Sequence, residues 1–270
     1  MSRIADIASA LAGYDPQALS VEGVQSFLAQ LVAPAVVKAA EQVPLREALG
    51  RVLAEDIISP VSVPPHDNSA MDGFAFDGAV LQGDAPIDTS IELRVVGTAL
   101  AGAAWRGTVA AGEAVRIMTG AVMPEGLDTV VPQEFCKIDG ERVNFPARVL
   151  RRGDNRRFAG EDLMQGQPAL RRGERLSPAA LGMAASLGIA SVPALRRLRV
   201  AYFSTGDEIL SLGEAPREGA VYDSNRYTVF GLLTRLGCEV IDLGLVGDDP
   251  ATLAGTLPRA APQAGALITT

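Results

Sequence analysis

The sequence predicts a multidomain protein that combines an α+β part with an α/β part. The 270 residues exceed the usual size of one domain, and 48% of them are hydrophobic, which is ample for more than one core. The residue pattern changes twice along the chain, from helical to strand-rich and then to alternating strands and helices. We therefore expect a helical or extended entry module, an inserted all-β module and a parallel-sheet α/β module.

The entry module is expected to be helical over residues 18–53. Ser20 can cap a first helix whose apolar residues follow the i, i+3, i+4, i+7 pattern, and Pro34 marks its expected end or kink. A second helix is predicted from Leu45 to Leu53, where Leu, Ala and Val repeat the same spacing.

Residues 63–77, VPPHDNSAMDGFAFD, follow neither helical nor strand periodicity and are therefore not predicted to form a core element. Pro64 and Pro65 lack backbone donors and hold the chain extended, as in a crossing between modules. Asp72 directly precedes Gly73, so its carboxylate can point out of the backbone at a tight bend. A well-capped surface turn would carry the same residues, and the sequence leaves both interpretations open.

A compact all-β module is predicted over about residues 75–145. The strand-like runs IELRVVGTAL, GEAVRIMTGA and DTVVPQE are separated by Gly and Pro. Thr119 and Gly120 lie where the second run should break into a loop, and the Thr hydroxyl and backbone amides there could hold an oxyanion. A plain strand-to-turn junction would have the same sequence.

Eight arginines and four acids occur between Arg148 and Arg175, which makes this segment cationic in a chain of net charge −8. A solvated linker is one interpretation. The other is a docking surface for phosphates, because the Arg guanidinium binds phosphate oxygens in bidentate fashion.

The last third of the chain alternates strands and helices. A short helix after Ser177 is expected to end at Gly188, and a buried strand follows at Val200–Phe203. Ser224 is expected to open the next helix, which is followed by the runs CEVIDLGLV, DDPATLAGTLPRAA and AGALIT, read as strand, helix and strand. This alternation predicts a parallel sheet with right-handed crossovers.

Polar residues follow the predicted strands where ligands bind in such sheets, at their carboxyl ends and at helix starts. These groups are Ser204 to Glu208, Asp223 to Arg226 and Asp248–Asp249. Asp249 precedes Pro250 and is expected to be a helix N-cap. Asp207, Glu208 and Asp248 are carboxylates that can hold Mg²⁺ against a phosphate.

Composition excludes several classes of function. The net charge of −8 argues against a general nucleic-acid binder, and no apolar run reaches the ~18 residues of a membrane span. We expect a cytoplasmic protein. Cys136 and Cys238 lack the spacing of a zinc site or redox pair and are expected to be buried free thiols. His66 is the only histidine and has no G-x-S-x-G motif beside it, so a turn histidine is predicted.

Six motifs resemble those of the molybdopterin molybdenumtransferases, the MoeA family, which includes the E domain of gephyrin. SAMDG before an aromatic residue, RIMTGAVMPEG and GDNRRFAGED resemble three family motifs, and STGDE, YDSNR and GDDP resemble its molybdopterin-binding domain. They occur in the family's order over essentially the whole chain. One departure weakens the expected anion binding: Phe158 and Ala159 stand where many members have further arginines.

The resemblance implies an enzyme that inserts molybdate into adenylylated molybdopterin and releases AMP with the help of Mg²⁺. It also implies a homodimer with sites built between subunits, and molybdopterin adenylyltransferase as the upstream donor. The implied catalytic residues are Asp72, Glu208 and Asp248, the last two also binding the metal. The implied molybdate or molybdopterin ligands are Ser69, Thr119, Asn155, Arg157 and Asp162. The implied nucleotide or phosphate ligands are Ser204, Thr205, Gly206, Asp207, Asp223 and Asn225.

The expected domains are a helical or extended linker module over 1–62 and 146–194, an inserted β module over 63–145, and an α/β molybdopterin-binding domain over 195–270. That last domain is expected to be incomplete, because a parallel sheet seldom ends on an apolar strand with no crossover after it. Residues 1–270 alone are therefore expected to be loosely folded over 195–270 and inactive.

Two rival functions stay open. The α/β part alone resembles nucleotide-cleaving relatives of competence-damage proteins, which would not need the SAMDG and RIMTGA motifs. A non-catalytic molybdopterin-binding scaffold would retain all of them.

Overall fold

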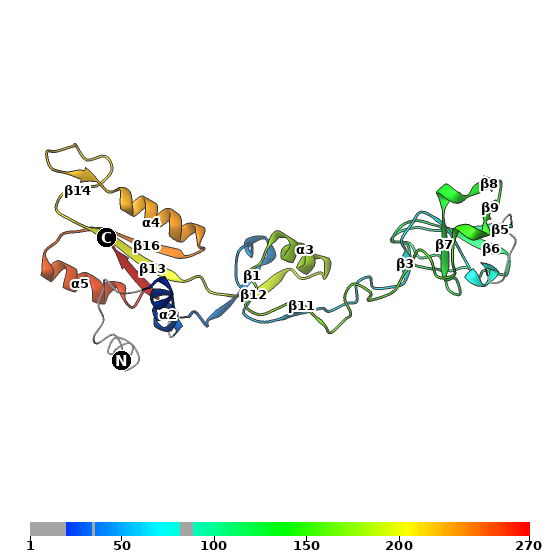
Figure 1. The fold of residues 1–270 in the computed structure, drawn as a ribbon, viewed down its shortest axis with the longest axis horizontal. Coiled ribbons are helices and arrows are strands. Elements are labelled where there is room, and N and C mark those ends of the chain that lie inside the picture. The colour runs from blue at the N-terminus through cyan, green and yellow to red at the C-terminus, as the bar shows by residue number, and fades with distance from the viewer. Residues whose placement is uncertain (1–19, 34–35, 82–88) are drawn as a thin grey trace. The chain divides into compact units, whose positions relative to one another are not determined.

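The computed structural model describes residues 20–33, 36–81 and 89–270, and Pro34, the expected end or kink of the first helix, lies outside these ranges. The described chain forms two compact units (Figure 1). The β unit is Asp56–Leu170, and the α/β unit contains the described residues up to Glu55 together with Arg171–Thr270. The three-module division expected from the sequence has other boundaries and stays a prediction. None of the described helices is both long and apolar enough to span a membrane.

The β unit is built on a six-stranded mixed sheet of order β7-β4-β6-β5-β9-β8. Only the β5–β6 pair is parallel; the other four pairs of this sheet are antiparallel. The all-β prediction for this part of the chain is confirmed, and all three runs named above are strands. The strands are β4 (Gly73–Phe76), β5 (Ser90–Ala99), β6 (Glu113–Ile117), β7 (Thr129–Pro132), β8 (Lys137–Asp139) and β9 (Arg142–Pro146).

Strand β4 lies in the core, so the prediction that residues 63–77 hold no core element was wrong. All four of its residues are buried between β6 and β7. Ala75 packs into the apolar cluster on one face of the sheet, whereas Phe74 and Phe76 pack into the cluster on the other. A strand buried on both faces shows no alternation of apolar and polar residues, which is why periodicity missed it.

Two glycines of the β unit make room for the indole of Trp105. A Cβ at Gly97 would lie 2.2 Å from the indole Nε1, and a Cβ at Gly107 would lie 2.1 Å from Cζ2 of the same ring. Trp105 packs, half-buried, against the cluster that contains Ala75.

Two short antiparallel pairs complete the β unit. Strand β2 (Ile57–Ile58) pairs with β11 (Pro168–Leu170), and β3 (Asn68–Ser69) pairs with β10 (Arg156–Arg157). The second pair joins two of the sequence motifs and is only two residues long on each strand.

The α/β unit begins with helix α2 (Val21–Val32), capped by the Ser20 hydroxyl as predicted. The predicted helix over Leu45–Leu53 was wrong. Strand β1 (Ala40–Pro44) pairs over five residues with β12 (Ser191–Leu195), and only one 3-10 turn follows, at Leu45–Glu47. Gly50 then takes a φ of +73°, and Leu53 is fully buried in an extended bridge to Ala194. Pairing with a distant strand thus overrides the local helical spacing.

The parallel sheet predicted for the last third is confirmed. Its order is β16-β13-β17, with β13 (Arg199–Thr205) in the centre and β16 (Glu239–Val246) and β17 (Ala266–Thr269) beside it. Residues Val200–Phe203 are buried throughout. The other elements of this region are α3 (Pro178–Ser186), β14 (Ile209–Leu210), β15 (Val221–Tyr222), α4 (Ser224–Arg235) and α5 (Pro250–Ala260).

The starts of these helices agree with the sequence. Helix α4 begins at Ser224, as expected, and the residue before it, Asp223, caps it, because the Asp223 carboxylate accepts from the amide of Arg226. Asp249 caps α5 before Pro250, as expected. Helix α3 ends at Ser186, and Gly188 leaves it with a φ of +75°, as a glycine at this place allows.

Substitution of Gly73 by Ala is predicted to destabilise the β unit. The added Cβ would lie 1.9 Å from the carbonyl oxygen of Val131, so the β4–β7 pair must separate at a cost of at least about 2 kcal/mol. Gly182→Ala is the control: a Cβ there meets no atom within 4 Å, and the free energy of unfolding should rise by about 0.5–1 kcal/mol. Urea denaturation followed by circular dichroism measures both, and a neutral Gly73→Ala variant would contradict this packing.

Candidate functional site

Three segments that are far apart in sequence meet in the β unit. They are the turn at 67–73, the end of β6 at 118–121 and the loop at 155–162. The amide of Gly120 donates to the carbonyl of Ser69, and the amide of Ala70 donates to the carbonyl of Asn155, at 2.8 and 2.9 Å. Three of the six motifs therefore form one hydrogen-bonded cluster, which we call the β-unit site.

Asp72 and Thr119 are in direct contact within the β-unit site. Oδ1 of Asp72 accepts from both the backbone amide and the hydroxyl of Thr119, each at 2.7 Å. The amide bond, then the hydroxyl bond, lowers the pKa of Asp72, with a smaller effect from the charge of Arg116. Asp72 is thus a carboxylate held ionised at a partly exposed bend, as its place before Gly73 suggested. Both Thr119 donors are used by Asp72, so the oxyanion role considered for them does not match this arrangement.

Ser69 has a local structural role here. Its side chain is buried; the hydroxyl donates to the carbonyl of Met71 at 2.6 Å and accepts from the amide of Met71 at 3.2 Å. Asn68, its neighbour, has a buried Oδ1 without a hydrogen-bond partner among the described residues. The turn therefore leaves one acceptor, on Asn68, unsatisfied.

The 155–162 loop carries the other residues predicted for this site. Asn155 has a φ of +61°, unusual for a non-glycine residue, and its side-chain amide donates to the carbonyl of Val130 at 2.9 Å. Arg157 is paired with the carboxylates of both Glu161 and Asp162. These two hydrogen bonds, the Glu161 bond first, raise the pKa of the guanidinium. An anion at Arg157 must therefore compete with two acids of its own loop.

Sequence reasoning missed Asp67 and Arg156. Oδ2 of Asp67 forms an ion pair with the guanidinium of Arg156, and Oδ1 accepts from the amide of Ala159 at 2.8 Å. The Ala159 bond, and then the bond from Arg156, lowers the pKa of Asp67. The guanidinium carbon of Arg156 also lies 4.9 Å from the centre of the Phe158 ring. The sequence signal was present in the string HDNSAMDG, but its first acid looked like a residue that closes a local turn.

The predicted ligands of the α/β unit gather at the carboxyl end of β13. Ser204 is buried, with its hydroxyl 3.0 Å from that of Tyr202, and Thr205 donates through its amide and hydroxyl to the carbonyl of Thr270. Gly206 has a φ of +136°, and a Cβ there would lie 2.7 Å from Oε2 of Glu208. The turn after β13 therefore requires glycine, and it presents Asp207 and Glu208 to solvent.

The second and third groups of predicted ligands lie at the start of α4 and after β16. Asp223 is 5% exposed; Oδ1 caps α4, but Oδ2 is buried with no partner among the described residues. Asn225 and Asp248 are exposed. A Cβ at Gly247 would lie 3.8 Å from Oδ1 of Asp207, so the loops after β13 and β16 approach each other as parallel strand ends should.

The donor set at these strand ends fits Mg²⁺ only with help from a ligand. The described residues contain no group of three or more His, Cys, Asp or Glu side chains placed to hold a metal ion. Mg²⁺ is commonly bound by one or two carboxylates, with phosphate oxygens and water completing the octahedron. Glu208 and Asp248 can supply such carboxylates.

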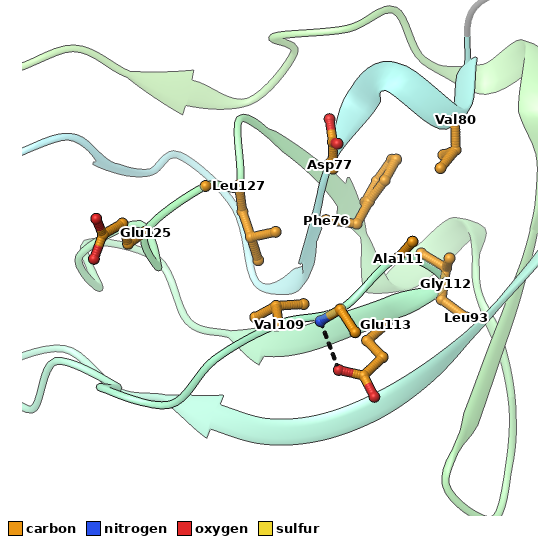
Figure 2. Close-up of a pocket in the computed structure, with 12 residues that line it drawn as sticks. Phe76, Asp77, Val80, Leu93, Val109, Ala111, Gly112, Glu113, Glu125 and Leu127 are labelled. Atoms are coloured by element: carbon orange, nitrogen blue, oxygen red, sulfur yellow. Dashed lines mark hydrogen bonds between the residues drawn. The ribbon is translucent and has the colours of Figure 1, made fainter.

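A separate cavity of about 160 Å³ lies in the β unit, and Figure 2 shows its lining. Phe76, Val109 and Leu127 contribute apolar walls, and a hydrogen bond from the Ala110 amide to Glu113 lies at its edge. None of the predicted site residues lines this cavity. It also contains neither of the two unsatisfied polar atoms found among the described residues, so its geometry points to no ligand.

The remaining reactive side chains lie outside these clusters. Cys136 and Cys238 are free thiols, as expected, but both are half-buried instead of fully buried. Desolvation of Cys136, with a smaller effect from Glu134, raises the pKa of its thiol to about 11. His66 is exposed in the bend before β3, in agreement with a turn histidine.

Comparison with known proteins identifies the family. Residues 19–188 match the family model described as MoeA N-terminal region (domain I and II). The chain belongs to the MoeA family. Residues 201–270 match a second model, described as probable molybdopterin binding domain. The family resemblance and the mixed α+β and α/β fold class predicted from the sequence are thus confirmed.

Curated relatives and a solved structure agree with this assignment. The molybdopterin molybdenumtransferase of Haemophilus influenzae is 42% identical over 229 residues, which are 85% of this chain and 55% of that protein. Molybdopterin molybdenumtransferase 2 of Mycobacterium tuberculosis is 37% identical over 84% of this chain and 56% of its own length. The chain therefore spans about half the length of these relatives. A crystal structure of the MoeA protein from Pyrococcus horikoshii OT3 matches 89% of this chain and 64% of that chain, with a TM-score of 0.80 and 32% identity.

The Asp72–Thr119 contact predicts a measurable titration. Because the pKa of Asp72 is lowered in the folded state, the contact is complete above the ordinary Asp pKa of about 3.9 and is lost as pH falls through the lower folded-state value. Thr119→Val removes the hydroxyl but keeps the amide, so the pKa of Asp72 should rise and still stay below its ordinary range. NMR titration of the carboxyl carbon measures this change. Asp249, whose pKa is lowered by its own N-cap bonds, is the internal control and should not move; an unchanged Asp72 would contradict the hydroxyl contact.

Proposed function

We propose that this MoeA-family chain takes part in inserting molybdate into adenylylated molybdopterin, with Mg²⁺-dependent release of AMP. The observation that carries the proposal is the β-unit site, where three family motifs that are far apart in sequence share one set of hydrogen bonds. The names of the relatives support the same reaction. Because the chain spans about half of their length, the activity is proposed for the full-length protein.

The β-unit site and the polar residues at the strand ends of the α/β unit suit two parts of this reaction, the binding of molybdate and the release of AMP. Molybdate and the pterin phosphate are anions, and the β-unit site offers them the guanidinium of Arg157; the ionised Asp72 is proposed as a catalytic group beside the bound anion and not as its ligand. The strand ends of the α/β unit offer Glu208 and Asp248 for Mg²⁺, while the buried, unsatisfied oxygen of Asp223 suits a donor group on a nucleotide. Mg²⁺ would supply charge neutralisation for the phosphate that leaves with AMP.

The proposal includes the partners and the compartment. A homodimer and an upstream molybdopterin adenylyltransferase follow from the family resemblance. A cytoplasmic location is supported by the two free cysteines, since disulfides are rare in the cytosol.

Molybdate-dependent AMP release separates this function from its rivals. A nucleotide-cleaving enzyme related to competence-damage proteins should release AMP without molybdate, whereas a scaffold should bind adenylylated molybdopterin and release none. The nucleotide-cleaving function also does not account for the contact between Asp72 and Thr119, since such an enzyme would not need the SAMDG and RIMTGA motifs that carry these residues. Turnover that needs both molybdate and Mg²⁺ would support the proposal.

Glu208→Gln is predicted to reduce Mg²⁺-dependent turnover at least about tenfold while leaving the fold intact, because an exposed carboxylate is replaced by a neutral group of the same size. AMP release measured against Mg²⁺ concentration gives the effect. Glu214→Gln is the matched control, since Glu214 lies exposed in the following loop and should tolerate the change. Equal kinetics in both variants would remove Glu208 from the site.

Subunit mixing tests the proposed homodimer. If Asp72 of one subunit and Glu208 of the other serve one site, a heterodimer of Asp72→Ala and Glu208→Gln chains retains one intact site. About one quarter to one half of the wild-type activity should then return after subunit exchange, according to the fraction of heterodimer formed. No recovery in verified heterodimers would count against a shared site.

A further inference from the structure

We infer that Asp67 is a positioning residue that holds the 156–162 loop against the Ser69–Gly73 turn and thereby sets the affinity of the β-unit site for its oxyanion. The inference rests on the proposed function, because it assumes that this site binds molybdate.

The backbone ladder between turn and loop is short: strands β3 and β10 pair through Asn68–Arg157 and Ser69–Arg156. Outside the ladder, the amide of Ala70 donates to the carbonyl of Asn155, and the amides of Gly160 and Asp162 donate to carbonyls of Pro64 and Val63, before the turn. A ladder this short needs such further contacts for stability. Asp67 lies directly before this ladder.

One carboxylate spans most of the loop. Oδ2 of Asp67 accepts from Nε of Arg156 at 3.0 Å and from its terminal nitrogen, while Oδ1 accepts from the amide of Ala159 at 2.8 Å. The side chains of Asp67 and Arg156 are only 30% and 26% exposed, so water screens this pair less than the more exposed Arg142–Glu92 pair of the same unit. Asp67 thus fixes two points of the loop, three residues apart.

The Phe158 ring completes the arrangement. The centre of the ring lies 4.9 Å from the guanidinium carbon of Arg156. The backbone amide of Phe158 donates to the carboxylate of Glu161 at 2.8 Å. The ring therefore supports Arg156 by a cation–π contact.

Arg157 depends on this arrangement for its place. Successive residues of a strand point to opposite faces, so when Asp67 holds Arg156 on one face, Arg157 projects from the other. Glu161 and Asp162 hold Arg157 from within the same loop, and neither ties it to the turn. Among the ion pairs of the loop in the described structure, the Asp67–Arg156 pair reaches the turn.

The test compares Asp67→Ala and Asp67→Asn with Glu92→Gln, in the full-length protein. Glu92 pairs with Arg142 across β5 and β9 of the six-stranded sheet and is remote from the loop in sequence, so its variant loses an Arg partner without touching the loop. Asp67→Asn keeps an acceptor for the Ala159 amide but loses the ion pair, which preserves the test if Asp67→Ala fails to fold.

Two readouts are expected to change together. Amide exchange over residues 156–162 should accelerate about tenfold in Asp67→Ala and less in Asp67→Asn, while the amides of β4 stay protected in both. The KM for molybdate should rise about tenfold with kcat changed less than about threefold, because a displaced loop weakens binding before it alters the reacting groups. Glu92→Gln should change neither readout.

The outcomes separate the two proposals. Unchanged exchange in both Asp67 variants, or faster exchange with an unchanged KM, overturns the positioning role. A wild-type protein without molybdate-dependent AMP release overturns the proposed function instead. In that case calorimetric titration with molybdate replaces KM, and equal affinity of wild type and Asp67→Asn overturns the positioning role.

Discussion

The double pairing of strand β4 is the constraint on which the β unit depends. Its four residues are buried between β6 and β7, and the carbonyl of Val131 approaches so closely that only glycine fits at position 73. Because the strand cannot shift along its neighbours without moving Phe74 and Phe76 out of their cluster, the residue before it is fixed as well. Asp72 therefore contacts Thr119 at the end of β6. The position of this carboxylate is thus set by the packing of strand β4 in the core.

Three of the eight arginines of the 148–175 segment form ion pairs with acids of the β unit. Arg152, Arg156 and Arg157 each pair with a carboxylate of the same unit, supplied by Asp128, Asp67 and the Glu161–Asp162 pair. These three guanidiniums are therefore not free, and an anion that binds one of them must compete with the carboxylate already paired to it.

Local signals in the sequence predicted much of the fold and part of the site. Helix caps at Ser20 and Asp249, the strands of the β unit and the parallel sheet are set by residues near each other in the chain, and these predictions were confirmed. The helix over 45–53 failed because Val52 and Leu53 form extended bridges to Arg175 and Ala194, which lie far along the chain. Asp67 was missed for the same reason, since its partners Arg156 and Ala159 follow it by about 90 residues. Contacts between residues so far apart in the chain produce no periodic pattern of apolar and polar residues in the sequence.

The position of Trp105, which packs against two glycines of the β unit, allows the folding of the two units to be followed by separate spectroscopic signals. Trp105 is the only tryptophan and lies in the β unit, whereas all four tyrosines lie outside residues 56–170. Selective excitation of the indole, whose ring is enclosed by Gly97 and Gly107, therefore follows the β unit alone. The near-ultraviolet circular dichroism of the buried Tyr202 follows the α/β unit. The chain thus carries, without labelling, a distinct chromophore for each of its folding units.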